Sequence, residues 1–157
     1  MPVSASAEIQ IYIDADAFPV KDEALKVADR HQLVIHYVSN SWMRLPDHFL
    51  VRRVIVEAGP DAADDWIADR ATAHDIVVTQ DIPLADRCLK AGAKAIGNTG
   101  KPYTLASIGM ALAMRDFNAH LRETGESRGF NAAFTKQHRS RFLEALEQAV
   151  QQIKRAV

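Results

Sequence analysis

The chain alternates short apolar runs with amphipathic stretches over its first two thirds. Isoleucine occupies every second position from Ile9 to Ile13, a period typical of a buried β-strand. Val20 to Arg30 places valine and alanine on one side and charged residues on the other, which predicts a helix. Further strands are expected at residues 33–38, 50–57, 76–79 and 93–96, and further helices at residues 61–74 and 83–90.

Two longer helical stretches complete the chain. Thr104 is expected to cap a helix over residues 104–124, and Thr135 to cap the last helix. Strands that alternate with helices form parallel sheets whose two faces are both covered. The pattern predicts a three-layer α/β protein with a mainly parallel central sheet of about five strands. We expect one domain over residues 1–157, with residues 1–7 as a flexible N-terminus.

Carboxylates directly follow two of the predicted strands. Asp14 and Asp16 come at the end of the first strand, and Asp81 comes at the end of the strand expected at residues 76–79. Because the carboxyl ends of parallel strands meet at one edge of a sheet, Asp14 and Asp81 are expected at the same edge, where ligands bind. Asp16 either faces the same pocket or caps the helix that begins near Pro19. The alternative role for Asp14 is to cap the next helix or to bond the amides of the turn, because aspartate favours turns.

The helix expected at residues 61–74 is rich in aspartate near its start. At about 100° per residue, Asp65 and Asp69 point to solvent, whereas Asp64 lies at the border of the apolar face. Asp64 is therefore the member of this helix that can turn toward the sheet edge, and Asp61 is the expected N-cap. Asp86, about one turn into the helix at residues 83–90, either reaches the acidic residues or faces water.

The acidic residues predict a divalent metal site. Carboxylates gathered on one edge repel one another unless a cation neutralises them, and hard oxygen ligands select Mg²⁺ or Mn²⁺ over Zn²⁺. Such ions position a phosphate, lower the pKa of a bound water and stabilise the leaving oxygen, which is the chemistry of phosphodiester hydrolysis. The expected catalytic residues are Asp14, Asp64 and Asp81, and the expected metal ligands are these three together with Asp16 and Asp86.

Four motifs occur in a fixed order over nearly the whole chain. They are Asp-Ala-Asp-Ala-Phe-Pro from residue 14, Asp-Asp-Trp-Ile from residue 64, Thr-Gln-Asp-Ile-Pro-Leu-Ala from residue 79 and Phe-Thr-Lys-Gln-His-Arg-Ser-Arg-Phe from residue 134. Together they resemble the YaiI/YqxD family of uncharacterised bacterial proteins. That family is grouped with PIN-like domains, many of which are metal-dependent ribonucleases.

The resemblance implies a PIN-like fold and a role for particular residues. Asp14, Asp64 and Asp81 would match the acidic positions of PIN-like domains, with Asp86 as a fourth. The chain departs from the family in its last loop, where Gly129-Phe130 stands in place of paired glycines.

Basic residues near the start of the last helix form a candidate anion-binding patch. They are Arg128, Lys136, His138, Arg139 and Arg141. Lys136 also lies at a helix N-terminus, where the helix dipole favours anions. We expect Arg128, Lys136 and Arg139 to contact substrate phosphates, although a solvated helix start would show the same residues.

Polar residues after two other strands are further candidates for substrate binding. Asn98 and Thr99 follow the strand expected at residues 93–96, and Asn40 follows the strand at residues 33–38. Trp42 and Arg44 come shortly after Asn40, where they would offer stacking to a base. Trp42 is equally compatible with a position in the core or with a contact to a partner, and of these we expect the core position.

Charge is distributed unevenly although the net charge is only −1. Residues 14–86 hold 14 Asp or Glu against 7 Lys or Arg, whereas residues 128–157 hold 6 Lys or Arg against 2 Glu. An acidic first part beside a basic tail suits a metal site whose anionic substrate is held from the other side. Solvated helix faces would give the same counts.

Other features of the sequence indicate the cellular compartment in which the protein is expected. Cys88 is the single cysteine, which excludes a disulfide framework and fits a reducing compartment. No apolar run is long enough to span a membrane, and residues 1–6 lack the pattern of a signal peptide. We therefore expect a cytoplasmic protein without a membrane partner, and the sequence leaves its oligomeric state open.

Three functions are compatible with these features. The leading hypothesis is a Mg²⁺- or Mn²⁺-dependent nuclease that cleaves RNA or, second to it, single-stranded DNA. The alternative is a non-catalytic module that binds nucleic acid or protein and keeps the acidic residues for structure. A third hypothesis is a phosphohydrolase for small nucleotides.

Overall fold

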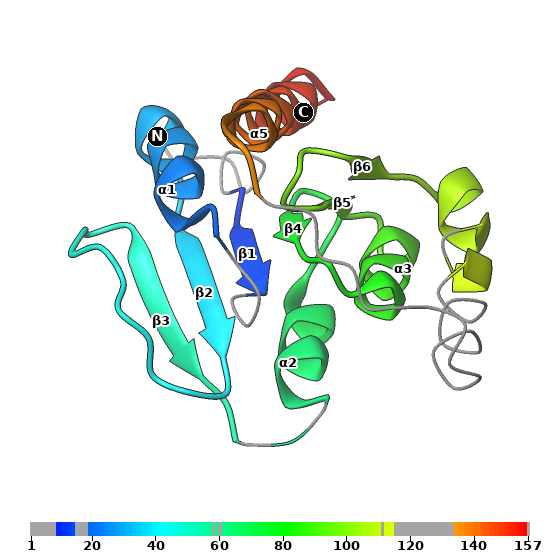
Figure 1. Cartoon of the computed structure of the whole chain (residues 1–157), viewed down its shortest axis with the longest axis horizontal. Helices are drawn as coiled ribbons and strands as arrows, with labels where there is room; N and C mark the ends of the chain where they lie inside the picture. The colour runs from blue at the N-terminus through cyan, green and yellow to red at the C-terminus, as the bar shows by residue number, and fades with distance from the viewer. Residues whose placement is uncertain are drawn as a thin grey trace, which may run out of the picture.

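The predicted strands and helices form one sheet with helices on both faces (Figure 1). The computed structural model describes residues 9–14, 19–57, 59, 61–110, 112–114 and 134–156. The elements in chain order are β1 (Ile11–Asp14), α1 (Lys21–His31), β2 (Ile35–Ser39), β3 (Val51–Ile55), α2 (Ala62–Arg70), β4 (Ile76–Val78), α3 (Ile82–Lys90), β5 (Lys94–Ile96), β6 (Pro102–Tyr103) and α5 (Lys136–Ala156). Residues 105–110 and 112–114 are also helical.

The six-stranded sheet has the order β3-β2-β1-β4-β5-β6, and only β5 and β6 are antiparallel. The predicted mainly parallel sheet is confirmed, with one strand more than expected. With only two residues, β6 is too short to produce a periodic pattern. It follows a turn at Gly100, whose φ of +89° suits glycine.

The order of the strands reverses between β1 and β4. From β1 the chain moves to β2 and β3 on one side, and it then crosses through α2 to β4 on the other side of β1. A reversal of this kind opens a crevice at the carboxyl ends of the two central strands, where α/β proteins bind their ligands. The ends of β1 and β4 are therefore the first place to look for a site.

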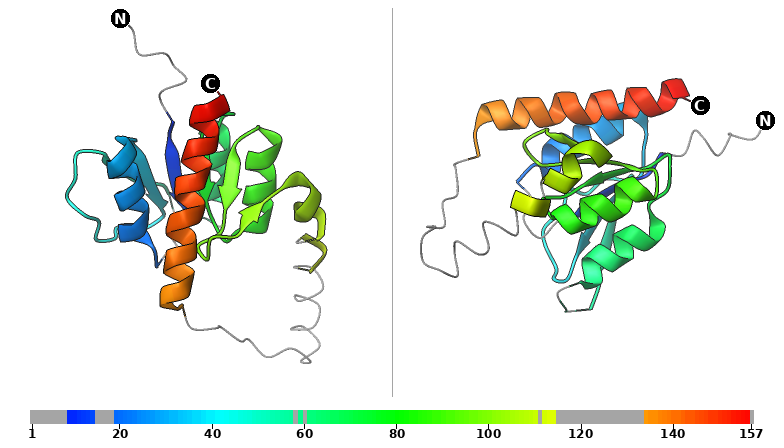
Figure 2. Two further views of the ribbon diagram at one scale, coloured as in Figure 1. Left: turned by 90° about the horizontal axis from the view of Figure 1, so that it is seen from above. Right: turned by 90° about the vertical axis from the view of Figure 1, so that its right-hand side faces the viewer.

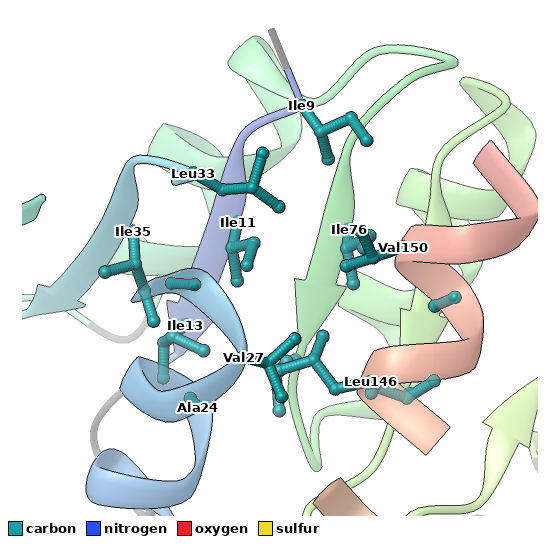
Figure 3. Packing of buried hydrophobic residues seen from close by; sticks show 14 of the residues in the cluster. Ile9, Ile11, Ile13, Ala24, Val27, Leu33, Ile35, Ile76, Leu146 and Val150 are labelled. Atoms are coloured by element: carbon teal, nitrogen blue, oxygen red, sulfur yellow. The ribbon is translucent and has the colours of Figure 1, made fainter. Parts of the chain in front are cut away.

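Each face of the sheet has its own core. Ile11 and Ile13 point toward α1 and α5, where Val27, Leu146 and others pack against them (Figure 3). Tyr12 points to the opposite face and packs in the cluster that includes residues of α2 and α3. Cys88 is buried in that second cluster, as expected for a small core residue. The near-continuous apolar character of β1 follows from burial on both faces.

The helices α1 and α5 run side by side in the same direction (Figure 2). Arg139 pairs with Glu23 near the start of α1 at 3.2 Å, and Glu147 pairs with His31 at its end at 2.9 Å. The start of α5 therefore lies at the same edge of the sheet as the start of α1, which is the carboxyl edge of β1.

Two of the predicted helices differ from expectation, one in where it ends and the other in which side chain is buried. The helix expected at residues 61–74 ends at Arg70, because the buried carboxylate of Asp75 accepts hydrogen bonds from the amide and hydroxyl of Thr72 at 2.9 and 3.0 Å and closes a turn. In the helix after Thr104 the sequence makes both Leu105 and Ile108 available for packing, but only Ile108 is buried, whereas Leu105 is 60% exposed. Beyond residue 114 the predicted helix lies outside the described residues.

Both predicted caps that precede these later helices are confirmed. Thr104 Oγ1 accepts a hydrogen bond from the amide of Ser107 at 3.0 Å, and Thr135 Oγ1 accepts one from the amide of His138 at 3.2 Å. In the described part of the chain, none of the helices is long and apolar enough to cross a membrane.

Candidate active site

Asp14 lies at the switch point between β1 and β4. It is the last residue of β1, and the pairing of Ile13 with Val78 places Thr79 next to it across the strands. Thr79 Oγ1 donates a hydrogen bond to Asp14 Oδ2 at 2.9 Å. The half-buried Asp14 side chain is therefore fixed at the carboxyl edge by the neighbouring strand.

Thr79 also connects Asp14 to Asp81. Its Oγ1 accepts a hydrogen bond from the backbone amide of Asp81 at 2.9 Å, and the residue is only 1% exposed. Sequence reasoning missed this residue. The signal available was its position, because Thr79 is the first polar residue after the apolar run of β4 and precedes Asp81 by two residues.

Asp81 is the N-cap of α3. Its Oδ1 accepts a hydrogen bond from the amide of Leu84 at 2.9 Å, and Pro83 occupies the first turn. A capping aspartate also meets the positive end of the helix dipole. Asp81 thus has a structural role in addition to its place beside Asp14.

Asp64 enters the site from the first turn of α2. Its half-buried carboxyl group lies beside that of Asp81. Burial, together with the nearby carboxylates of Asp81 and Asp14, raises the pKa of Asp64 from 3.8 to about 7. The three carboxylates predicted to be catalytic are thus electrostatically coupled to one another in the structure.

The remaining aspartates of α2 take other roles. Asp65 and Asp69 are exposed, as predicted, and Asp65 pairs with Arg87 at 2.7 Å. Asp61 is the N-cap residue of α2, as expected from its position, but its side chain makes no capping hydrogen bond. Asp64 is therefore the member of this acidic helix that is coupled to Asp14 and Asp81.

One predicted ligand pairs with a lysine of its own helix, and two other predicted residues lie outside the described part of the chain. Asp86 pairs with Lys90, one turn further along α3, at 2.9 Å. Asp16 and Arg128 lie outside the described residues. The roles predicted for these residues stay predictions.

The loop after β5 closes one side of the site. Gln80 Oε1 accepts a hydrogen bond from the amide of Asn98 at 2.7 Å, and a Cβ on Gly97 would lie 2.7 Å from the same oxygen. Asn98 is buried and Thr99 half-buried, so the loop is held closely against the end of β4. The Tyr103 hydroxyl donates to the carbonyl of Thr79 at 3.4 Å. Burial and the charge of Asp81 raise the pKa of Tyr103.

The start of α5 brings basic residues to the same edge of the sheet. Arg139 Nη1 donates to the carbonyl of Pro19 at 2.7 Å, directly after the segment that connects β1 to α1. Lys136, the first residue of α5, is exposed. A Cβ on Gly100 would lie 2.5 Å from the backbone of Arg141, so the loop after β5 also contacts α5 closely.

The polar segment after β2 differs from expectation at one residue. Asn40 is exposed at the carboxyl end of β2, where it was predicted. Trp42 is 66% exposed, so the expected core position was wrong. The residue lies in the segment that leaves β2 and returns to the edge strand β3. The side chain of Arg53 covers its ring instead, with Cζ 5.0 Å from the ring centroid.

The donor set suits a hard divalent cation. Among the described residues, no three or more His, Cys, Asp or Glu side chains are grouped so that they alone could hold an ion. Mg²⁺, however, usually takes one or two protein carboxylates and completes its shell with water and substrate phosphates. Asp64 and Asp81, with Asp14 beside them, fit that mode of binding.

Thr79→Val is expected to lower the free energy of unfolding by about 2 kcal/mol, because valine leaves the Asp81 amide and one Asp14 oxygen without their buried partner. Thr79→Ser retains the hydroxyl and is the matched control. Urea unfolding of the two variants measures the difference. Equal midpoints and slopes for both variants would show that the hydroxyl bonds contribute nothing.

The fold and the site define an α/β protein with an acidic centre at the switch point of a mainly parallel sheet. The chain belongs to the YaiI/YqxD family, whose model, described as "Uncharacterized BCR, YaiI/YqxD family", matches residues 12–152. The family predicted from the four sequence motifs is thereby confirmed.

Several relatives align with nearly the whole chain. A UPF0178 protein of Parvibaculum lavamentivorans is 62% identical over 146 residues, which are 93% of this chain and 96% of the relative. UPF0178 proteins of Rhizobium meliloti and Agrobacterium fabrum are 59% and 56% identical, and the alignments cover 92% and 93% of this chain and 99% and 95% of the relatives. No solved structure matches the chain. The grouping with PIN-like domains stays a prediction.

Proposed function

We propose that this protein is a Mg²⁺- or Mn²⁺-dependent nuclease that hydrolyses phosphodiester bonds in RNA. The observation that supports it best is the coupling of Asp64 to Asp81 and Asp14 at the switch point of the sheet. Burial and, after it, the neighbouring carboxylates raise the pKa of Asp64, and a bound cation would stabilise the ionised carboxylate against both effects. When bound, such an ion lowers the pKa of a water and stabilises charge on the phosphate.

Different residues of the chain would bind the ion, bind the phosphate and position α5. Asp64 and Asp81, with Asp14 beside them, would hold the ion together with water and substrate phosphates, and Thr79 fixes Asp14 and Asp81 relative to each other. Lys136 and the first amides of α5 offer positive charge to a phosphate at the same edge. Arg139 is engaged by Pro19 and Glu23, so its first role is to hold the start of α5 in place.

Calorimetric titration with Mn²⁺ tests the metal site. The wild type is expected to show saturable binding, and Asp14→Asn is expected to lose it, because a neutral amide is a poor ligand for a hard cation. Asp69→Asn removes one charge from an exposed position and is expected to bind like the wild type. Equal binding by Asp14→Asn and the wild type would contradict the assignment.

One observation favours a second function, a non-catalytic module that binds nucleic acid. Asp81 caps α3 and Asp14 accepts a hydrogen bond from Thr79, so both have a structural use without a metal. This alternative predicts RNA binding that weakens with salt and survives Asp81→Asn, without cleavage under any divalent metal. Cleavage of RNA by the wild type would exclude it.

A further inference from the structure

Trp42 has an indole ring that is exposed to solvent, in the segment between β2 and β3. The residue is 66% exposed, whereas tryptophan is highly buried on average. Arg53 lies over the ring at 5.0 Å from its centroid, and its Nη2 donates to the carbonyl of Met43 at 3.1 Å. The guanidinium thus supports the ring, and the high exposure leaves much of the indole open to a ligand.

The surroundings of Trp42 are positively charged. Residues 40–53 contain three arginines against one aspartate, Asp47. The arginines Arg44, Arg52 and Arg53 are all exposed, and none of them takes part in the ion pairs found in the described part of the chain. Arg52 donates instead to the carbonyl of Phe49 at 2.6 Å. Arg52 lies beside His36 on the other face of the sheet, so the charge available to an anionic partner next to Trp42 is that of Arg44 and Arg53.

We propose that Trp42, supported by Arg53, is a stacking platform for a base of single-stranded RNA, with Arg44 contacting a neighbouring phosphate. The inference rests on the proposed function and names where the substrate lies. An exposed aromatic ring beside uncompensated arginines suits single strands, because unstacked bases stack on aromatic and guanidinium planes while the phosphates meet the positive charge. Tryptophan and arginine are also enriched in protein interfaces, so a protein contact is the competing outcome that the experiment below must separate from RNA binding.

The platform lies within reach of the acidic site. Asp14 pairs with Val38 in the register of β1 and β2, and Trp42 follows Val38 by four residues. With strands about 4.8 Å apart and at most about 3.5 Å per residue, the two Cα atoms are separated by no more than about 19 Å. A stacked strand of roughly six nucleotides covers that distance. An octanucleotide can therefore occupy both places at once.

Binding of a fluorescein-labelled RNA octanucleotide, followed by anisotropy in EDTA, measures the platform without cleavage. Trp42→Ala is expected to weaken binding by roughly 5- to 100-fold, the usual range for loss of one base-stacking ring. Trp42→Phe should recover part of that loss. Phe49→Ala is the matched control, because Phe49 is an equally exposed ring in the same segment, 69% exposed and stacked on His48 at 4.9 Å.

Fluorescence of Trp42 gives a second readout that a purely structural role would not change. In a Trp66→Phe background the remaining tryptophan is Trp42, and stacking of an unlabelled octanucleotide is expected to quench its emission saturably. Absence of quenching, or wild-type RNA affinity in Trp42→Ala, would overturn the proposal. A change of oligomeric state in Trp42→Ala with unchanged RNA affinity would also overturn it and would assign the surface to a protein contact.

The outcomes separate this inference from the nuclease assignment. RNA binding that depends on Trp42, in a wild type that cleaves under no divalent metal, supports the platform and refutes the nuclease. Cleavage that depends on Asp81 but not on Trp42, with equal octanucleotide affinity for Trp42→Ala, supports the nuclease and refutes the platform.

Discussion

Asp81→Asn is expected to reduce RNA cleavage by roughly 10²- to 10³-fold or more while leaving the fold intact. Substitution of the carboxylate removes charge that would bind the cation and stabilise the transition state. Asparagine caps helices about as well as aspartate, so the bond to the Leu84 amide can be kept. Time courses with an end-labelled oligoribonucleotide in Mn²⁺ measure the rate.

Two further variants separate the charge of Asp81 from its capping role. Asp81→Ala is expected to lose the same activity and, in addition, about 1 kcal/mol of stability, because alanine cannot accept the bond from Leu84. Asp69→Asn, on the exposed side of α2, should retain full activity and shows that charge loss alone is not the cause. Unchanged turnover by purified Asp81→Asn would refute the catalytic assignment.

Much of the fold and part of the site can be predicted from local patterns. Isoleucines at every second position define β1, and the carboxylate that follows is placed at the sheet edge by the strand itself. Helical geometry alone separates Asp64 from the exposed Asp65 and Asp69. These features depend on residues that are close in sequence, so the periodicity of the sequence is enough to predict them.

The features that the sequence did not reveal depend on which strands are neighbours. The contact of Thr79 with Asp14 joins residues 65 positions apart and exists because β4 pairs with β1. The contact of Gln80 with Asn98 likewise needs β4 beside β5. The order of the strands in the sheet cannot be predicted from the periodicity of any single segment. The prediction for Trp42 was wrong for a related reason. A single aromatic residue in a segment without periodicity does not indicate whether its side chain points to the core or to solvent.

The affinity for Mn²⁺ is expected to fall below about pH 7 with a slope that approaches tenfold per pH unit, so that binding at pH 5 is roughly 50-fold weaker than at pH 7. Burial and the charges of Asp81 and Asp14 raise the pKa of Asp64 to about 7. A raised pKa means that the folded protein holds this proton more tightly than a free carboxyl does. Below that pKa a cation must therefore displace the proton, whereas above it the ligand is already ionised. Calorimetry over the range from pH 5 to pH 8 measures the slope.

Asp64→Asn provides the decisive comparison, because it removes the titrating group while leaving Asp14 and Asp81. The variant should bind Mn²⁺ more weakly than the wild type at pH 8, yet with an affinity that hardly changes between pH 5 and pH 7. Asp69→Asn, an exposed aspartate of the same helix, should keep the wild-type slope. Titrations in buffers of different ionisation enthalpy should detect about one proton released per ion by the wild type below pH 7 and almost none by Asp64→Asn. A wild-type affinity that stays constant across this range would mean that the ion does not bind at Asp64, and the acidic centre would then serve the structure of the sheet edge.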